Sequence, residues 1–184
     1  MLSYKDFKKG YLNEWVDRSQ AARRAAEELA MKDTTTLSDR YKEEGLVFFL
    51  DGHRVEFKGE NEKNPKDKKY NFFTYDEAIE RFGEPDLKDG WRLPTKEEFE
   101  ALCKYPYKLK NKQDVIDNRL SLPAAGYRSC YGNLNYVGSD GFYWSYTPNV
   151  LEEAWYFCFY SDEVGMGSGS RCDGHSVRLV RDVK

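Results

Sequence analysis

Apolar residues recur at spacings of three, four and seven over residues 4–31, which is the spacing of one helix face. Alone, such a helix would expose its aromatic side chains, so we expect it to pack on its own domain or on a second copy of the chain. The stripe resembles a loose heptad seam, which leaves homo-oligomerisation open beside ordinary packing within one chain. It consists of Tyr4, Phe7, Tyr11, Trp15, Ala22, Ala25 and Leu29, and Arg18 interrupts it.

Two short apolar runs at 46–50 and 53–57 are separated by Asp51-Gly52. Asp-Gly between apolar runs is the strongest short-range signal of a β-hairpin, because both turn residues adopt positive φ. The preceding residues, 34–45, indicate a short second helix. Residues 58–70 are mostly charged, with acids that nearly cancel the lysines, and they predict a mobile, solvated loop.

Two capping boxes predict the helices that follow. Thr74 with Glu77 begins a helix that continues to residue 82, and Thr95 with Glu98 begins one that continues to residue 103. From residue 118 onward the helical pattern is replaced by short β-like runs between Gly, Ser, Asn and Asp. These runs predict an antiparallel meander and, with the helices before it, an α+β fold. They lie at 120–127, 141–146, 154–160 and 175–181.

The composition is that of a folded protein, with 184 residues, 40% hydrophobic and 33% charged. We expect an N-terminal helical segment over 1–45, for packing or oligomerisation, and one domain over 46–184. The 14 tyrosines suit a binding face as well as a core. The net charge of −3 gives no electrostatic attraction to nucleic acid or to anionic membranes.

The chain has no apolar run near the roughly 20 residues of a membrane span and no apolar segment typical of a signal peptide. We therefore expect no membrane insertion and a place in the cytoplasm or a phage virion, or on a cell surface if a signal was removed. None of the four cysteines forms a C-x-x-C pair, which argues against zinc or redox chemistry. Without a sign of export, free thiols are expected.

Four motifs occur in order: GWRLPTKEEF at 90–99, LPAAGYR at 122–128, GFYWSYT at 141–147 and GHSVRLVR at 174–181. Together they resemble the bacterial and phage branch of the C-type-lectin-like fold, which includes the Fibrobacter-type paralogous domain and the formylglycine-generating-enzyme-like group. The resemblance covers residues 72–184 and implies this fold for the domain. Trp91 and Trp144 would then fill the core, and Val177 and Leu179 would form the buried face of a strand.

Residues 128–173 are rich in Tyr, Ser, Gly, Asp and Asn and contain three of the cysteines. This composition resembles the variable proteins of diversity-generating retroelements, such as the phage major tropism determinant, a receptor-binding protein. The resemblance implies a diversified ligand-binding surface made by Tyr131, Asn133, Asn135, Tyr146, Asn149, Tyr156, Cys158, Tyr160, Asp162, Ser168, Ser170, Cys172 and Asp173.

Alternation along one strand adds to this prediction. Tyr156, Cys158, Tyr160 and Asp162 would share one face and contact ligand, whereas Trp155, Phe157 and Phe159 would face the core. A plainer alternative keeps 161–174 as a flexible Gly/Ser loop between strands.

Three other functions match parts of the sequence. The formylglycine-generating relatives are oxidases that use a cysteine pair and copper, for which Cys158 and Cys172 could be proposed. The chain is short for that family, and two histidines offer no Cys-His arrangement. Residues 147–149 only partly match the calcium ligands of sugar-binding lectins, so we expect neither metal nor cofactor. A structural subunit of a phage or surface appendage shares the fold. The favoured expectation is a non-enzymatic binder of a protein or glycan on a cell surface.

Overall fold

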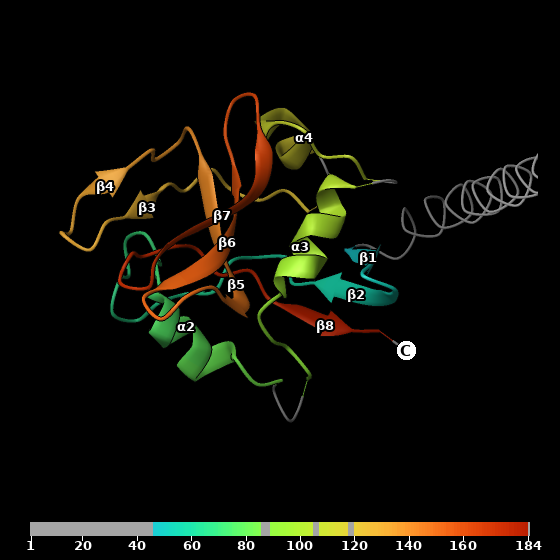
Figure 1. The fold of residues 1–184 in the computed structure, drawn as a ribbon, viewed down its shortest axis with the longest axis horizontal. Helices are drawn as coiled ribbons and strands as arrows, with labels where there is room; N and C mark the ends of the chain where they lie inside the picture. Colours follow the sequence, from blue (N-terminus) through green and yellow to red (C-terminus); the bar gives the residue numbers. More distant parts are fainter. Residues whose placement is uncertain (1–45, 86–88, 105–106, 118–119, 184) are drawn as a thin grey trace, which may run out of the picture. The chain divides into compact units, whose positions relative to one another are not determined.

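The computed structural model describes residues 46–85, 89–104, 107–117 and 120–183 (Figure 1). They belong to one compact unit, Glu44–Lys184, which mixes helices and sheets and has more strands than helices. The helices expected at 4–31 and 34–45, and the oligomer interface expected on them, lie outside the described residues.

The hairpin at Asp51-Gly52 is confirmed. Strands β1 (Val47–Leu50) and β2 (His53–Phe57) pair antiparallel, and the two turn residues have φ values of 47° and 85°. On its other edge β2 pairs with β8 (Val180–Asp182), so the sheet order is β1-β2-β8. The start of the described chain and its C-terminal strand therefore share one sheet.

Both capping boxes are confirmed. They begin α2 (Tyr75–Phe82) and α3 (Lys96–Cys103), and in each the threonine hydroxyl accepts the N–H of a glutamate that reaches back to the cap. A third helix, α4 (Lys112–Asp117), was not predicted. At its start the N–H of Asp114 donates to the Asn111 side chain at 2.9 Å, and the Asp114 carboxylate accepts the N–H of Lys110 at 2.8 Å. This Asn–Asp pair differs from the Ser/Thr–Glu/Gln pattern of a capping box, which is the signal that predicted the other two helices.

The central sheet consists of β5 (Gly141–Pro148), β6 (Glu153–Phe159) and β7 (Val164–Ser170), all antiparallel. The alternative that made 161–174 a loop is wrong for β7, which pairs with β6 over its whole length. Glycine is depleted in strands, so its presence at every second position of β7 concealed the strand. A two-stranded ribbon of β3 (Tyr127–Arg128) and β4 (Leu134–Asn135) projects beside this sheet, and the rest of the run expected at 120–127 is not a strand (Figure 1).

The two faces of the central sheet pack on different elements. On one face, Tyr143 and Phe157 belong to a core shared with Phe99 of α3 and with the β1–β2 hairpin. On the other face, Trp144 and Ala154 pack in a second core with residues of α2. This division follows from the alternation of side chains along β5 and β6.

Of the two tryptophans expected in the core, only Trp144 is there, and the last expected strand is shorter than predicted. Trp144 is fully buried, and its indole N–H donates to the Phe73 carbonyl at 2.8 Å. Trp91 is only half-buried, because its ring lies beneath the cationic groups of Lys58 and Arg181 at the domain surface. The strand expected at 175–181 is limited to β8, and both Ser176 and Arg178 are buried beside the expected Val177 and Leu179.

Burial of Arg178 orders the charged loop at 58–70. The guanidinium donates to the Asn61 side chain at 2.8 Å, to the Lys58 carbonyl at 3.0 Å and to the Leu120 carbonyl at 3.2 Å. Asn64, in the same loop, is buried and donates to the Phe72 carbonyl. The loop is therefore fixed to the domain by buried polar bonds, which its charge pattern does not reveal.

Candidate functional site

A hollow of about 290 Å³ lies between the β3–β4 ribbon, the central sheet and the chain that follows β7. We call it the tyrosine pocket, because four of its eight lining residues are tyrosines. The lining residues are Tyr127, Tyr136, Asp140, Phe142, Tyr156, Tyr160, Asp173 and His175.

Phe142 of β5 forms the floor of the tyrosine pocket. It is 4% exposed, and its ring centroid lies 5.0 Å from that of Tyr127, 5.8 Å from that of Tyr156 and 5.9 Å from that of Tyr160. Each of these three pairs is edge-to-face, a favourable arrangement for aromatic rings. One buried ring thus contacts Tyr127 of β3, Tyr156 of β6 and Tyr160, the residue that follows β6.

The glycines of β7 make room for Tyr156. Its cross-strand partner is Gly167, and a Cβ added there would lie 2.6 Å from the Tyr156 ring. At Gly169 the distance would be 3.1 Å, whereas a Cβ at Gly165 would meet no atom within 4 Å. Alternate glycines therefore leave a bare strip on this face of β7, and the Tyr156 ring lies along it.

His175 belongs to the wall of the tyrosine pocket and is 2% exposed. Its ring stacks on Trp144 with centroids 4.0 Å apart, and the edge of Tyr156 meets it at 4.7 Å. Burial lowers the pKa of His175 to about 3, so the ring is neutral at physiological pH. Its Nδ1 has no hydrogen-bond partner among the described residues.

Two carboxylates, Asp140 and Asp173, complete the lining. Asp173 accepts the N–H of Cys130 at 2.9 Å, and burial raises the pKa of its carboxyl above the usual value. The side chain of Asp140 makes no hydrogen bond or ion pair within the described residues. No lysine or arginine is among the lining residues, so the tyrosine pocket has an excess of negative charge.

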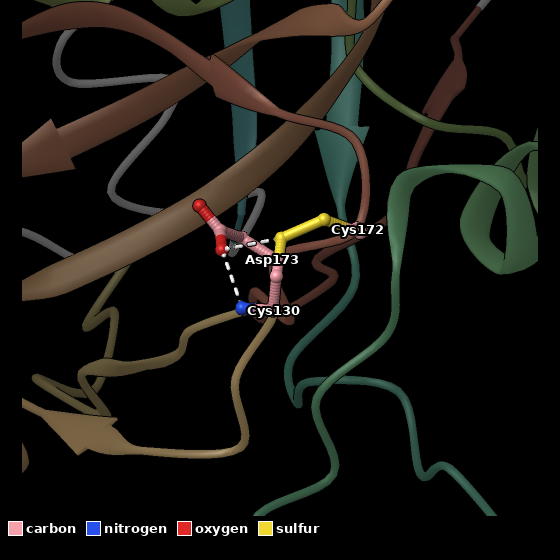
Figure 2. A group of neighbouring side chains, drawn as sticks. All are labelled: Cys130, Cys172 and Asp173. Carbon is pink, nitrogen blue, oxygen red and sulfur yellow. Dashed lines mark hydrogen bonds between the residues drawn. A yellow bond between two sulfur atoms is a disulfide. The ribbon is translucent and has the colours of Figure 1, made fainter.

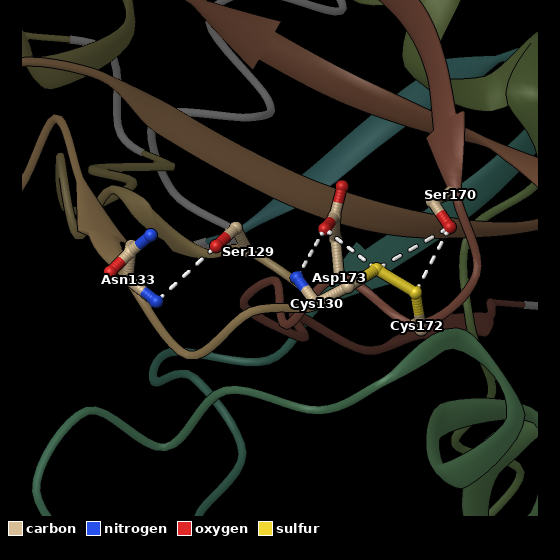
Figure 3. The surroundings of a disulfide bond; sticks show 6 residues. All are labelled: Ser129, Cys130, Asn133, Ser170, Cys172 and Asp173. Atoms are coloured by element: carbon tan, nitrogen blue, oxygen red, sulfur yellow. Dashed lines mark hydrogen bonds between the residues drawn. A yellow bond between two sulfur atoms is a disulfide. The ribbon is translucent and has the colours of Figure 1, made fainter.

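A disulfide lies beside Asp173, one of the lining residues of the tyrosine pocket (Figures 2 and 3). Cys130, in the turn between β3 and β4, is bonded to Cys172, just beyond β7, so the expectation of free thiols is wrong for these two. The fold brings their Cα atoms to 5.2 Å although they are 42 positions apart, which cysteine spacing cannot reveal. Cys103 and Cys158 are free.

The disulfide also fixes the local backbone around Asp173. The sulfur of Cys130 lies 3.2 Å from Asp173 Oδ1, and the hydroxyl of Ser170 lies 3.1 Å from the sulfur of Cys172 (Figure 3). The same turn is held on its other side where the N–H of Asn133 donates to the Ser129 hydroxyl at 3.2 Å. The β3–β4 ribbon is therefore tied to the segment that carries Asp173 and His175.

Three of the predicted contact residues, Tyr156, Tyr160 and Asp173, meet in the tyrosine pocket. The alternation predicted along β6 is only partly correct. Phe157 and Phe159 are buried as expected, but Cys158 is also buried, at 5% exposed, and its thiol donates to the Gly165 carbonyl. Cys158 is covered because it faces the glycine strip beneath Tyr160 and not solvent. Trp155 was expected in the core and is half-buried, with the Lys96 ammonium 3.9 Å from its ring.

The other predicted contacts are spread over the surface outside the tyrosine pocket. Tyr131, at 92% exposed, Asn133 and Asn135 lie on the β3–β4 ribbon. Ser168 faces the opposite side of β7 from Tyr156, since its neighbour Gly167 is the residue paired with Tyr156. The remainder lie at strand ends and turns: Tyr146, Asn149, Asp162, Ser170 and Cys172.

The sequence prediction missed five lining residues: Tyr127, Tyr136, Asp140, Phe142 and His175. Three of them lie inside motifs that we assigned to the scaffold. Tyr136 and Asp140 lie within the Tyr- and Asp-rich segment, whose composition was the signal that could have found them. Tyr136 has a φ of 57°, a conformation rare for a tyrosine that places its ring near that of Tyr127, 6.1 Å away.

A second, larger and more open hollow of about 600 Å³ lies where the start of α2 meets the β5–β6 turn. Its polar groups largely satisfy one another. Arg171 donates from Nε to Asp76 at 3.0 Å and from its terminal nitrogens to Asp76 and to the Leu151 carbonyl. Since the Arg171 guanidinium is already paired with Asp76 inside it, this hollow is a weaker candidate for a binding site than the tyrosine pocket.

One cluster has the donor set of a metal site but a structural role. His53, Glu98 and Asp182 come together around Arg92, whose guanidinium donates to both oxygens of Glu98 at 2.9 and 2.7 Å. It also donates to Asp182 at 2.8 Å. Burial would raise the pKa of the Glu98 carboxyl, but the bonds from Arg92 and from the Thr95 N–H hold it below its usual value. Arg92 already supplies the cation and joins α3 to β8.

Comparison of the chain with protein-family models finds no match, and comparisons with curated proteins and with solved structures find none either. Among the described residues, no helix combines the length and apolar character needed to cross a membrane. The likeness to the C-type-lectin-like fold therefore depends on the four sequence motifs.

Proposed function

We propose that this protein is a non-enzymatic binding protein whose residues 46–184 form a C-type-lectin-like domain. The tyrosine pocket and the polar surface around it would hold a protein or glycan ligand on a cell surface. The observation that carries the proposal is the convergence of four tyrosines from separate segments on one hollow. Tyrosine contributes large contact area and a hydroxyl at a small cost in conformational entropy, which suits a recognition surface.

The chemistry of the lining supports binding over catalysis. His175 is neutral and buried against Trp144, and no hydrogen bond joins it to a nucleophile in the described part of the chain. The oxidase alternative depended on Cys158 and Cys172 as a pair. Cys172 is instead bonded to Cys130, and Cys158 is a separate buried thiol.

Retroelement diversification of residues 128–173 is part of the proposal. Apart from the buried Cys158, the predicted contacts lie on a turn, in strands near the surface and on the wall of a pocket, positions where side chains can change with little effect on the core. Sequencing the DNA that flanks the gene tests this directly. A reverse-transcriptase gene and a near-copy of this segment that differs only at adenines would support diversification. Their absence would favour the second candidate, a structural phage or appendage subunit.

Binding itself is tested with the fluorescently labelled full chain on a glycan array and on intact bacterial cells. We expect Tyr156→Ala with Tyr160→Ala to abolish the signal, because the change removes two walls of the tyrosine pocket. Phe49→Ala is the matched control, since Phe49 is an exposed aromatic on β1, in a different sheet. If the double variant keeps its melting temperature and still binds like the wild type, the proposal is wrong.

A further inference from the structure

The tyrosine pocket combines aromatic rings with carboxylates that no lysine or arginine of the lining neutralises. Tyr127, Tyr136, Tyr156 and Tyr160 surround it, and Asp140 and Asp173 add two carboxylates. Aromatic rings attract a cation through the negative potential of their faces, and several rings around one hollow strengthen this attraction. Such a lining disfavours an anionic or purely apolar ligand.

We propose, on the basis of the binding function above, that the tyrosine pocket receives an organic cation that carries N–H groups, the guanidinium or ammonium of an arginine or lysine side chain on a protein ligand. The carboxylates select among cations. A quaternary ammonium group has no hydrogen to donate, whereas guanidinium and ammonium groups donate to carboxylate oxygens in strong, charge-assisted bonds.

The two carboxylates are placed to accept such bonds. Asp173 uses Oδ1 for the Cys130 N–H, which leaves acceptor capacity on its other oxygen. The side chain of Asp140 has no partner in the described part of the chain. Burial disfavours the charged form of the Asp173 carboxyl, and a bound cation would relieve this cost.

The wall of the tyrosine pocket carries an independent sign of a ligand site. His175 is almost fully buried, yet its Nδ1 has no hydrogen-bond partner among the described residues. Leaving a buried polar atom unsatisfied destabilises a fold, and such atoms need an explanation other than stability. Because the ring is neutral, His175 adds no positive charge that would repel a cationic ligand.

The size of the hollow agrees with a single side chain. A volume of about 290 Å³ is at the lower end of small-ligand sites, which span roughly 300–1,000 Å³. Hard metal ions fit the lining less well, because they require six or more oxygen ligands, and here rings occupy most of the wall.

The experiment titrates the full chain with four small probes, followed by NMR. The probes are N-acetyl-arginine methylamide, N-acetyl-lysine methylamide, the neutral N-acetyl-leucine methylamide and tetramethylammonium chloride. We expect saturable binding of the arginine and lysine probes, weaker binding of tetramethylammonium and none of the leucine probe. Equal binding of the leucine probe, or no binding of either cationic amino acid, would overturn the inference.

Variants assign the binding to the two carboxylates. Asp140→Asn with Asp173→Asn keeps the shape of the lining and should weaken the arginine probe roughly tenfold or more, as expected for hydrogen bonds to charged groups. Glu163→Gln is the control, because Glu163 is an exposed acid in the β6–β7 turn, outside the lining and outside the predicted contacts. An unchanged affinity in the double variant would contradict the inference.

The two proposals can fail separately. If Tyr156→Ala with Tyr160→Ala abolishes binding to cells while the cationic probes do not bind, the pocket is a ligand site of another chemistry. If the probes bind and the same variant still binds cells, the cation site is real and the proposed function fails.

Discussion

The glycine strip of β7 allows a controlled perturbation of the tyrosine pocket. In Gly167→Ala the new methyl would lie 2.6 Å from Cε2 of Tyr156 and 2.8 Å from its Cζ and hydroxyl. The ring cannot swing away freely, because Trp144, Phe142 and His175 contact it on other sides. Gly165→Ala makes the same chemical change two residues earlier on the same strand, where no atom lies within 4 Å.

The two substitutions should therefore act in opposite directions on the free energy of unfolding. Alanine in place of glycine stabilises a strand by roughly 0.5–1 kcal/mol, which is the expected result for Gly165→Ala. At Gly167 this gain is offset by overpacking against a confined ring, which costs about 1–3 kcal/mol. Gly167→Ala should then be less stable than Gly165→Ala by about 1–3 kcal/mol.

Urea unfolding followed by tryptophan fluorescence measures this difference. Binding of the arginine probe measures the displacement of Tyr156, and only Gly167→Ala should weaken it. Equal stability and equal binding in the two variants would refute the argument that the bare strip exists to hold Tyr156.

Three further results are expected. Replacing Cys130 and Cys172 with serine should lower the free energy of unfolding, measured with urea, by about 4 kcal/mol. The loss comes from the chain entropy that the unfolded state regains when its 42-residue loop is no longer closed. Four titratable thiols in the unreduced, denatured wild type would contradict the disulfide. The pKa of His175 is about 3 in the folded state and 6.5 in the unfolded state. Its contribution to the free energy of unfolding is therefore fully present above pH 6.5 and is lost as the pH falls toward 3, by up to about 5 kcal/mol. His175→Phe should flatten a plot of stability against pH in that window, and an unchanged slope would show that another group titrates. Glu98→Ala should lower the free energy of unfolding by about 3–5 kcal/mol, because it leaves the Arg92 guanidinium without its buried partner. Thermal or urea unfolding measures the loss, and a value below about 1 kcal/mol would argue against a buried ion pair.

The elements that the sequence predicted are those whose signals are local. Asp51-Gly52 specified the first hairpin, and the threonine–glutamate pairs at the starts of α2 and α3 specified where those helices begin. Each depends on residues within four positions of one another. Pairing of β8 with β2, by contrast, joins residues more than 120 positions apart, and no local pattern indicates it.

The parts of the site that were missed depend on tertiary contacts. Glycines at alternate positions of β7 resemble a flexible loop until Tyr156 is seen to occupy the space that they leave. The disulfide requires knowledge that the β3–β4 turn, which carries Cys130, lies beside the chain just beyond β7, which carries Cys172. Phe142 and His175 lie in apparent scaffold motifs, and their role in the tyrosine pocket follows from their neighbours alone.

The central claim is that a ligand occupies the tyrosine pocket. Hydrogen–deuterium exchange of the full chain, with and without a ligand found on the array or on cells, tests it most directly. We predict slower exchange in the β3–β4 ribbon, in β5 near Phe142, at the end of β6 and around Asp173. Protection confined to the hollow at the start of α2, or found only on the β1–β2–β8 sheet, would contradict the claim.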